Sequence, residues 1–92
     1  MNRNSKISNL IDTADKFFSL GKYSDAFSIY LETEKVGYAT ARVYNNMALC
    51  KKYLGDFSAS AQIFQELIKR HSDYTPAYIN LTRLLTSLNN NE

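Results

Sequence analysis

The sequence predicts an all-α protein made of stacked helical hairpins, and three observations support this. Two similar stretches, LGKYSDAFSIY from Leu20 and LGDFSASAQIF from Leu54, begin 34 residues apart. Glycine and proline, which interrupt helices, number only three and one in 92 residues. Apolar residues recur at spacings of three and four, which places them on one face of a helix. A period of this length predicts a helix–turn–helix unit that repeats along the chain.

The period divides the chain into two full units and a partial third. We expect repeat units at 7–40 and 41–74, a partial unit at 75–88 and a tail at 89–92. A chain of 92 residues has room for a single core, so residues 1–92 are expected to form one domain.

Five helices are expected, near Ser5–Leu20, Ser24–Val36, Thr40–Leu54, Ser58–Arg70 and Thr75–Leu88. Gly21 and Gly55 suit the left-handed backbone conformation that ends a helix. Ser24 and Ser58 follow these glycines and are predicted to cap the second and fourth helices. Thr75 is predicted to cap the last helix, with Pro76 in its first turn.

Small residues at matching positions predict that the two helices of each unit approach closely. In the two full units each first helix carries an alanine at the eighth position, where the partial third unit has Thr82. Each second helix carries a small residue at position 20 and an aromatic residue one turn later. These residues are Ala14, Ala26 and Tyr30 in the first unit, and Ala48, Ser60 and Phe64 in the second.

The last helix is expected to cap the stack. Its inward stripe is predicted to contain Tyr78, Leu81, Leu85 and Leu88, whereas Ile79 and Leu84 fall off that stripe.

The period and the pattern resemble the tetratricopeptide repeat (TPR) family, as a small protein of about two and a half repeats. The resemblance is carried by the Leu-Gly pairs, the aromatic residues Tyr23 and Phe57, and the small and aromatic positions of each second helix. The proline expected near the end of each unit is replaced by Tyr38 and Ser72. The resemblance implies antiparallel helical hairpins stacked in a right-handed α-solenoid, whose first helices line a concave face.

The resemblance also implies that the concave groove binds a peptide or a helix of another protein. The positions of this chain that match the groove include Asp12, Asp15, Arg42, Asn45, Asn46, Leu49, Tyr53, Ile79, Asn80 and Arg83. Asparagines can hydrogen-bond a peptide backbone, and Arg42 and Arg83 favour an acidic segment. A solvated polar face without a ligand stays open as the alternative.

The expected function is therefore a non-enzymatic protein-interaction module, working as an adaptor, a scaffold or a dedicated chaperone with a protein or peptide partner. A self-assembling structural module that associates through a terminal helix is the alternative. Two and a half units fall below the three usually needed for stability, so a homo-oligomer is a second possibility.

Catalysis, cofactors and metal sites are not expected. His71 is the only histidine and lies at a helix end, and Cys50, the only cysteine, is predicted to pack in the core. Asp12 and Asp15 share a helix face but have no further ligands for a metal.

Nucleic acid and membrane insertion are not expected either. The net charge of +2 is weak, and Asp12 and Asp15 interrupt the basic inner face that RNA-binding helical repeats need. No apolar run approaches the roughly 20 residues that cross a bilayer. The first ten residues contain no apolar signal core, so we expect a cytoplasmic protein.

Overall fold

Five α-helices follow one another along the chain, as the sequence predicts. The computed structural model describes residues 3–89, and the side chains of residues 5–89. The helices are α1 (Arg3–Ser19), α2 (Tyr23–Lys35), α3 (Ala41–Tyr53), α4 (Phe57–Arg70) and α5 (Thr75–Asn89), and the described residues contain no strand. Asn89 still belongs to α5, and the rest of the predicted tail, residues 90–92, lies outside the described residues.

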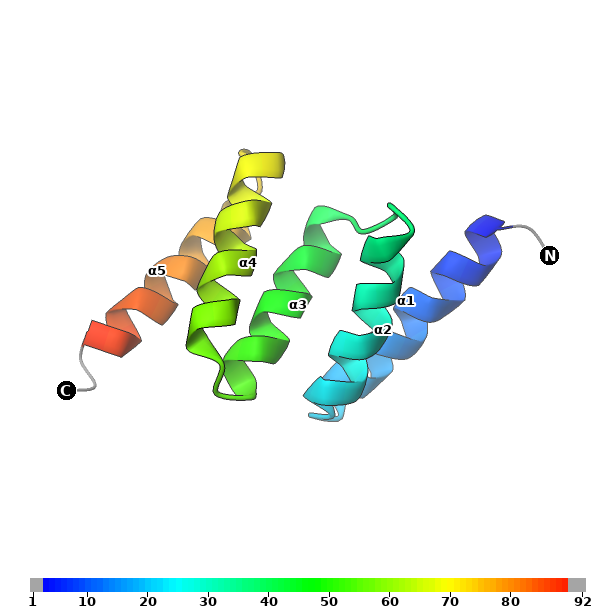
Figure 1. Cartoon of the computed structure of the whole chain (residues 1–92), viewed down its shortest axis with the longest axis horizontal. Coiled ribbons are helices and arrows are strands. Elements are labelled where there is room, and N and C mark those ends of the chain that lie inside the picture. The colour runs from blue at the N-terminus through cyan, green and yellow to red at the C-terminus, as the bar shows by residue number, and fades with distance from the viewer. Residues whose placement is uncertain (1–2, 90–92) are drawn as a thin grey trace.

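The helices are arranged in two rows that make a solenoid. Each helix packs against the next one in the chain, and α3 also contacts α1 and α5. Within the described residues α2 and α4 make no comparable contact. The odd-numbered helices therefore form a continuous row, whereas the even-numbered helices lie apart on the other side (Figure 1). The all-α solenoid is confirmed, while its handedness and the division into repeat units stay predictions.

The core is built from matching positions of the two complete hairpins. Ala14 and Ala26 are fully buried in the first hairpin, and Ala48 and Ser60 are fully buried in the second. Ser60 donates a hydrogen bond from its Oγ to the carbonyl of Ala48 at 2.7 Å, so a polar side chain is satisfied at the point of closest approach. The small residues thus lie where the sequence pattern requires two helices to meet.

Three glycines end helices in the same way. Gly21, Gly37 and Gly55 have φ angles of +76°, +80° and +87°. In the first turn the N–H of Lys22 donates to the carbonyl of Phe17 at 2.9 Å, and in the third the N–H of Asp56 donates to Lys51 at 2.8 Å. This is the Schellman arrangement, in which a left-handed residue lets the chain satisfy the last carbonyls of a helix. The predicted roles of Gly21 and Gly55 are confirmed.

The predicted N-caps are wrong. Ser24 and Ser58 lie inside α2 and α4, one residue after each helix begins. The side chain of Asp56 caps α4 instead by accepting a hydrogen bond from the N–H of Ala59 at 3.1 Å. The Schellman turns are so short that each helix starts two residues after its glycine, which leaves the serines too late to cap. Thr75 is likewise the first residue of α5.

The predicted inward stripe of α5 is wrong at three of its four residues, and only Leu81 packs against the core. Leu84, expected to lie off the stripe, is fully buried together with Ala77. Tyr78, Leu85 and Leu88, expected inside, are 43%, 44% and 39% exposed. We expected α5 to bury the same face that α1 and α3 bury against the second helix of their own hairpins. In the structure α5 packs against the preceding α4, and residues 3–89 contain no later helix that would cover its other face.

The corrected capping residue can be tested by two alanine substitutions. Asp56→Ala is expected to lower the free energy of unfolding by about 1 kcal/mol, because the N–H of Ala59 loses its acceptor. Ser58→Ala, at the residue predicted from sequence, is expected to change it by less than about 0.5 kcal/mol. Urea unfolding followed by circular dichroism measures both. Equal losses in the two variants would contradict the assignment.

Candidate binding surface

The ten residues predicted to line a groove all come from the row of odd-numbered helices. Asp12 and Asp15 lie on α1, four on α3 together with Tyr53 at its end, and three on α5. The structure brings several of these side chains into contact with one another. How much of the surface is free for a partner therefore depends on which of them are already bonded inside the chain.

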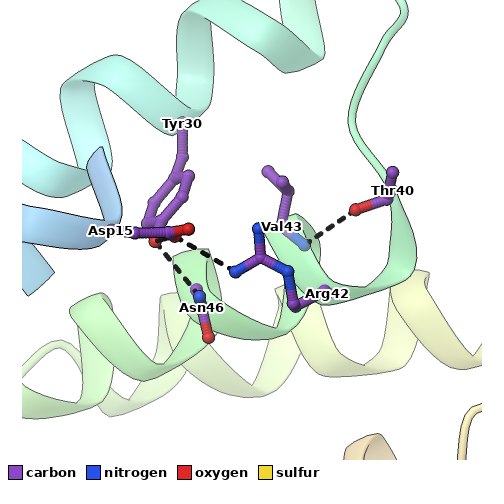
Figure 2. A network of polar contacts seen from close by, with 6 residues as sticks. All are labelled: Asp15, Tyr30, Thr40, Arg42, Val43 and Asn46. Carbon is purple, nitrogen blue, oxygen red and sulfur yellow. Dashed lines mark hydrogen bonds and ion pairs between the residues drawn. The ribbon is translucent and has the colours of Figure 1, made fainter. Parts of the chain in front are cut away.

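A polar network joins the first hairpin to the second (Figure 2). The hydroxyl of Tyr30, on α2, donates to Oδ1 of Asp15 on α1. Arg42 on α3 donates from Nη1 to the same oxygen at 3.1 Å, and Asn46 donates from Nδ2 to the Tyr30 hydroxyl, also at 3.1 Å. Three helices thus converge on one carboxylate and one phenol, and the network fixes how the second hairpin sits on the first.

Burial and neighbouring charges keep Tyr30 and Arg42 protonated, so that both donate hydrogen bonds within the network. Burial, followed by the hydrogen bond to Asp15, raises the pKa of the Tyr30 hydroxyl above its ordinary value, so it stays protonated and donates. The hydrogen bond to Asp15 raises the pKa of Arg42 as well. Asp15 accepts both bonds as a carboxylate, which makes them stronger than bonds between neutral groups.

The same positions of the second hairpin are apolar. Counting 34 residues on from Asp15 and Tyr30 gives Leu49 and Phe64. Phe64 is fully buried, and Leu49 packs against the core cluster that contains it. An acid–phenol pair in one repeat is therefore replaced as a unit by an apolar pair in the next. The sequence analysis missed the role of Tyr30, although a tyrosine where the other repeat has phenylalanine was the signal, because a buried hydroxyl needs a partner.

A second contact joins α3 to α5. Asn80 donates from Nδ2 to Oδ1 of Asn45 at 3.0 Å, and Asn45 is 7% exposed. These two asparagines were predicted to bond a peptide backbone, but each already has a partner within the chain. They align the row of odd-numbered helices.

Aromatic rings gather where α1, α2 and α3 meet near the first glycine turn. The centroids of Tyr23 and Tyr53 are 4.7 Å apart, and Phe18 meets the edge of Tyr23 at 5.5 Å. Tyr53 is 52% exposed, and the Nζ of Lys52 lies 5.7 Å from its ring centre. Tyr53 is thus held in place from one side and open to solvent on the other.

The other predicted residues differ in access. Leu49 is half-buried, Ile79 is 46% exposed, and Asp12 and Arg83 are exposed. Apolar contact is therefore available at Tyr53 and Ile79, and free charge at Asp12 and Arg83.

Two open recesses lie along α1, away from most of the predicted groove. One of about 360 Å³ is lined by Asp15, Lys16, Ser19 and Leu20, and one of about 270 Å³ is lined by Lys6, Asn9, Leu10 and Thr13. The matching positions on α3 are Val43, Met47 and Cys50, which are buried, whereas α1 has Asn9, Thr13 and Lys16. This flank of α1 thus carries polar side chains at positions where α3 buries apolar ones, with Leu10 and Leu20 beside them.

Among the described residues no group of three or more histidine, cysteine or acidic side chains is placed to hold a metal ion. Cys50 is fully buried, as predicted, and burial raises the pKa of its thiol to about 12. His71 follows the last residue of α4, as predicted. Within residues 3–89 no helix combines the length and the apolar character that crossing a membrane requires.

The network can be tested by copying the apolar pair of the second repeat into the first. Tyr30→Phe alone is expected to lower the free energy of unfolding by about 1–2 kcal/mol, because Asp15 and Asn46 each lose a bond. The double variant Asp15→Leu/Tyr30→Phe is expected to lose less than the sum of the two single variants, since the pair acts as a unit. Chemical denaturation of the four proteins measures this coupling, and strict additivity would contradict it.

The buried thiol predicts slow alkylation. Cys50 is expected to react with iodoacetamide at neutral pH at least about a hundredfold more slowly in the folded chain than in urea, because its thiolate is both rare and inaccessible. Mass spectrometry over time measures the rate. The Ser58→Cys variant supplies an exposed thiol in the same fold as a control. Equal rates at the two cysteines would show that Cys50 is accessible.

Comparison with known proteins identifies a family. A model of the coatomer epsilon subunit family matches residues 14–92, from the middle of α1 to the last residue. A search among curated proteins gives no match. The family match covers most of the chain and includes all the residues of the polar network and of the aromatic cluster. The chain therefore belongs to the coatomer epsilon subunit family.

Proposed function

We propose that the chain is a non-enzymatic protein-interaction subunit that binds a segment of another coatomer subunit on the row formed by α1, α3 and α5. The family supplies the first support, because its name describes a subunit of a complex. The second support is the surface itself, which carries open apolar and charged side chains on a rigid scaffold. The TPR type of the repeat and a cytoplasmic location are part of this proposal.

Hydrogen bonds within the chain leave only some side chains of this row available to a partner. Asp15, Asn46, Asn45 and Asn80 are engaged with one another or with Tyr30 and Arg42, so they shape the surface. Tyr53 and Ile79 remain about half exposed on this row, and Arg83, four residues after Ile79 on α5, is exposed. Aromatic and arginine side chains dominate the energetics of protein interfaces.

This distribution defines the partner segment in chemical terms. An apolar or aromatic side chain would pack on the open face of Tyr53, which Phe18 and Tyr23 support from behind. An acidic side chain would pair with Arg83, while Asp12 disfavours an acidic group over α1. The proposed segment is therefore apolar near the end of α3 and acidic over α5.

The proposal is tested by co-expressing the tagged chain with the other coatomer subunits of its source organism. Wild type is expected to retain at least one of them on the resin. Tyr53→Ser/Arg83→Ala is expected to weaken that association by at least about tenfold, as losing two central contacts should. Titration of the retained subunit by calorimetry gives the affinity.

A matched variant on the other row serves as the control. Phe57→Ser/Lys69→Ala changes an exposed aromatic residue and an exposed cation on α4, and is expected to bind as wild type does. Circular dichroism confirms that both double variants keep their helices. Equal loss of binding in the two variants, or unchanged binding in Tyr53→Ser/Arg83→Ala, would refute the proposed surface.

A further inference from the structure

Two sets of side chains join α1 to α3. One is the polar network, in which Asp15 on α1 accepts a hydrogen bond from Arg42 on α3 at 3.1 Å. The other is the aromatic cluster, in which the rings of Phe18 on α1 and Tyr53 on α3 have their centroids 6.4 Å apart. The backbones of α1 and α3 approach each other much less than those of α2 and α3 do. The placement of α1 against α3 therefore depends mainly on these side chains.

The two sets lie at successive levels of the same two helices. Asp15 and Phe18 are three residues apart on α1, so they project from adjacent turns of one face. Asn46 and Tyr53 are seven residues apart on α3, which is two turns along one face. A rotation or a slide of α1 that broke the network would therefore also move Phe18 relative to Tyr53.

Tyr30 connects the network without reaching the surface. Its hydroxyl donates to Asp15 and accepts from Asn46, so a single oxygen on α2 joins α1 to α3 (Figure 2). Tyr30 is fully buried. A partner on the row of odd-numbered helices cannot contact it, so any effect of the Tyr30 hydroxyl on binding must pass through other residues.

The next junction along the chain, between α3 and α5, has neither set. Its acid–phenol pair is replaced by the apolar pair described above. The residues 34 positions after Phe18 and Tyr53 are Lys52 and Ser87, so the two rings are replaced as well. The directional network and the exposed tyrosine with its supporting rings thus occur together at one junction and are absent together from the other.

We propose that the polar network holds Tyr53 in the orientation that the partner binds, and that Tyr30 is a positioning residue of this surface. The inference rests on the proposed function, because it concerns the same binding surface. Phe18 and Tyr23 support Tyr53 from one side, and the network keeps α1 at the place where Phe18 gives that support. A ring that is already held in its bound orientation loses less conformational freedom when the partner packs on it.

Proton NMR of the chain without a partner provides the first test. Tyr30→Phe removes the central hydroxyl and keeps the ring. It is expected to shift the ring-proton resonances of Tyr53 toward those of an unfolded tyrosine, because these protons sense the rings of Tyr23, 4.7 Å away, and of Phe18. Comparison with Tyr53→Phe assigns the resonances. Unchanged Tyr53 resonances in Tyr30→Phe overturn the proposal.

Ser60→Ala is the matched control. It also removes one buried hydroxyl, whose hydrogen bond to the carbonyl of Ala48 lies inside the second hairpin. Its loss of stability is expected to be comparable, since each variant gives up buried hydrogen bonds of one hydroxyl. The Tyr53 resonances are expected to stay at their wild-type positions. An equal shift in Ser60→Ala would mean a general loosening of the fold and would overturn the specific role of the network.

Calorimetric titration with the coatomer subunit that the wild-type chain retains gives the second test. Tyr30→Phe is expected to raise the dissociation constant by at least about fivefold, as coupling between two sites does. Ser60→Ala is expected to bind as wild type does, and an unchanged dissociation constant in Tyr30→Phe overturns the proposal. A wild-type chain that retains no subunit refutes the proposed function instead, and the NMR comparison still decides whether the network positions Tyr53.

The double variant Asp15→Leu/Tyr30→Phe separates positioning from stability. It installs the apolar pair of the second hairpin and is expected to lose less stability than the two single changes together. The Tyr53 resonances are nevertheless expected to remain shifted, because apolar contacts do not replace directional bonds. Their return to the wild-type positions would show that packing alone orients the ring and would overturn the proposal.

Discussion

The close approach of two helices within each hairpin is the contact on which the other features of the fold depend. At its centre the side chains are small on both helices, Ala14 and Ala26 in one hairpin, and Ala48 and Ser60 in the other, and all four are fully buried. A larger side chain would separate the helices and open voids beside Tyr30 and Phe64, which fill the space one turn along. The Asp15 network and the Asn45–Asn80 bond then join the odd-numbered helices of hairpins that are closed in this way. The row of odd-numbered helices therefore depends on the spacing of small residues as much as on its own polar residues.

The repeat made much of this fold predictable from the sequence, and the failures have a common cause. Helix number, the glycine turns and the buried small residues depend on local pattern and on the period, both of which are visible in one chain. The serine caps failed because each helix begins two residues after the glycine of its Schellman turn, which is one residue before the serine. The prediction for α5 failed because the repeat pattern describes a helix with neighbours on both sides, whereas residues 3–89 contain no helix after α5. Asn45 and Asn46 were placed on the correct row, but their partners on α5 and α2 depend on side-chain directions that a period does not define.

The polar junction makes the two hairpins unequal. Where the second hairpin packs Leu49 and Phe64 by apolar contact, the first uses a carboxylate, a phenol, an amide and a guanidinium whose bonds have fixed directions. Apolar contacts tolerate sliding of one helix over another, whereas a network of directional bonds does not. The junction therefore fixes the angle between α1 and α3, and with it the support that Phe18 and Tyr23 give to Tyr53. Two repeats that look equivalent in sequence therefore differ in role: directional hydrogen bonds orient the first hairpin, and apolar packing stabilises the second.

The position of α5 at the edge of the stack has a consequence for how the chain opens. In a linear array each element is stabilised only by its neighbours, so an end helix with one flank uncovered can detach without disturbing the rest. Only Ala77 and Leu84 of α5 are fully buried, whereas α3 has helices on both sides and contributes more buried apolar residues than any other described helix. Amide hydrogens of α5 should exchange with solvent through local fraying, and those of α3 only through global unfolding. A helix packed on the exposed side of α5 would suppress this fraying, and the amide hydrogens of α5 would then be protected as those of α3 are.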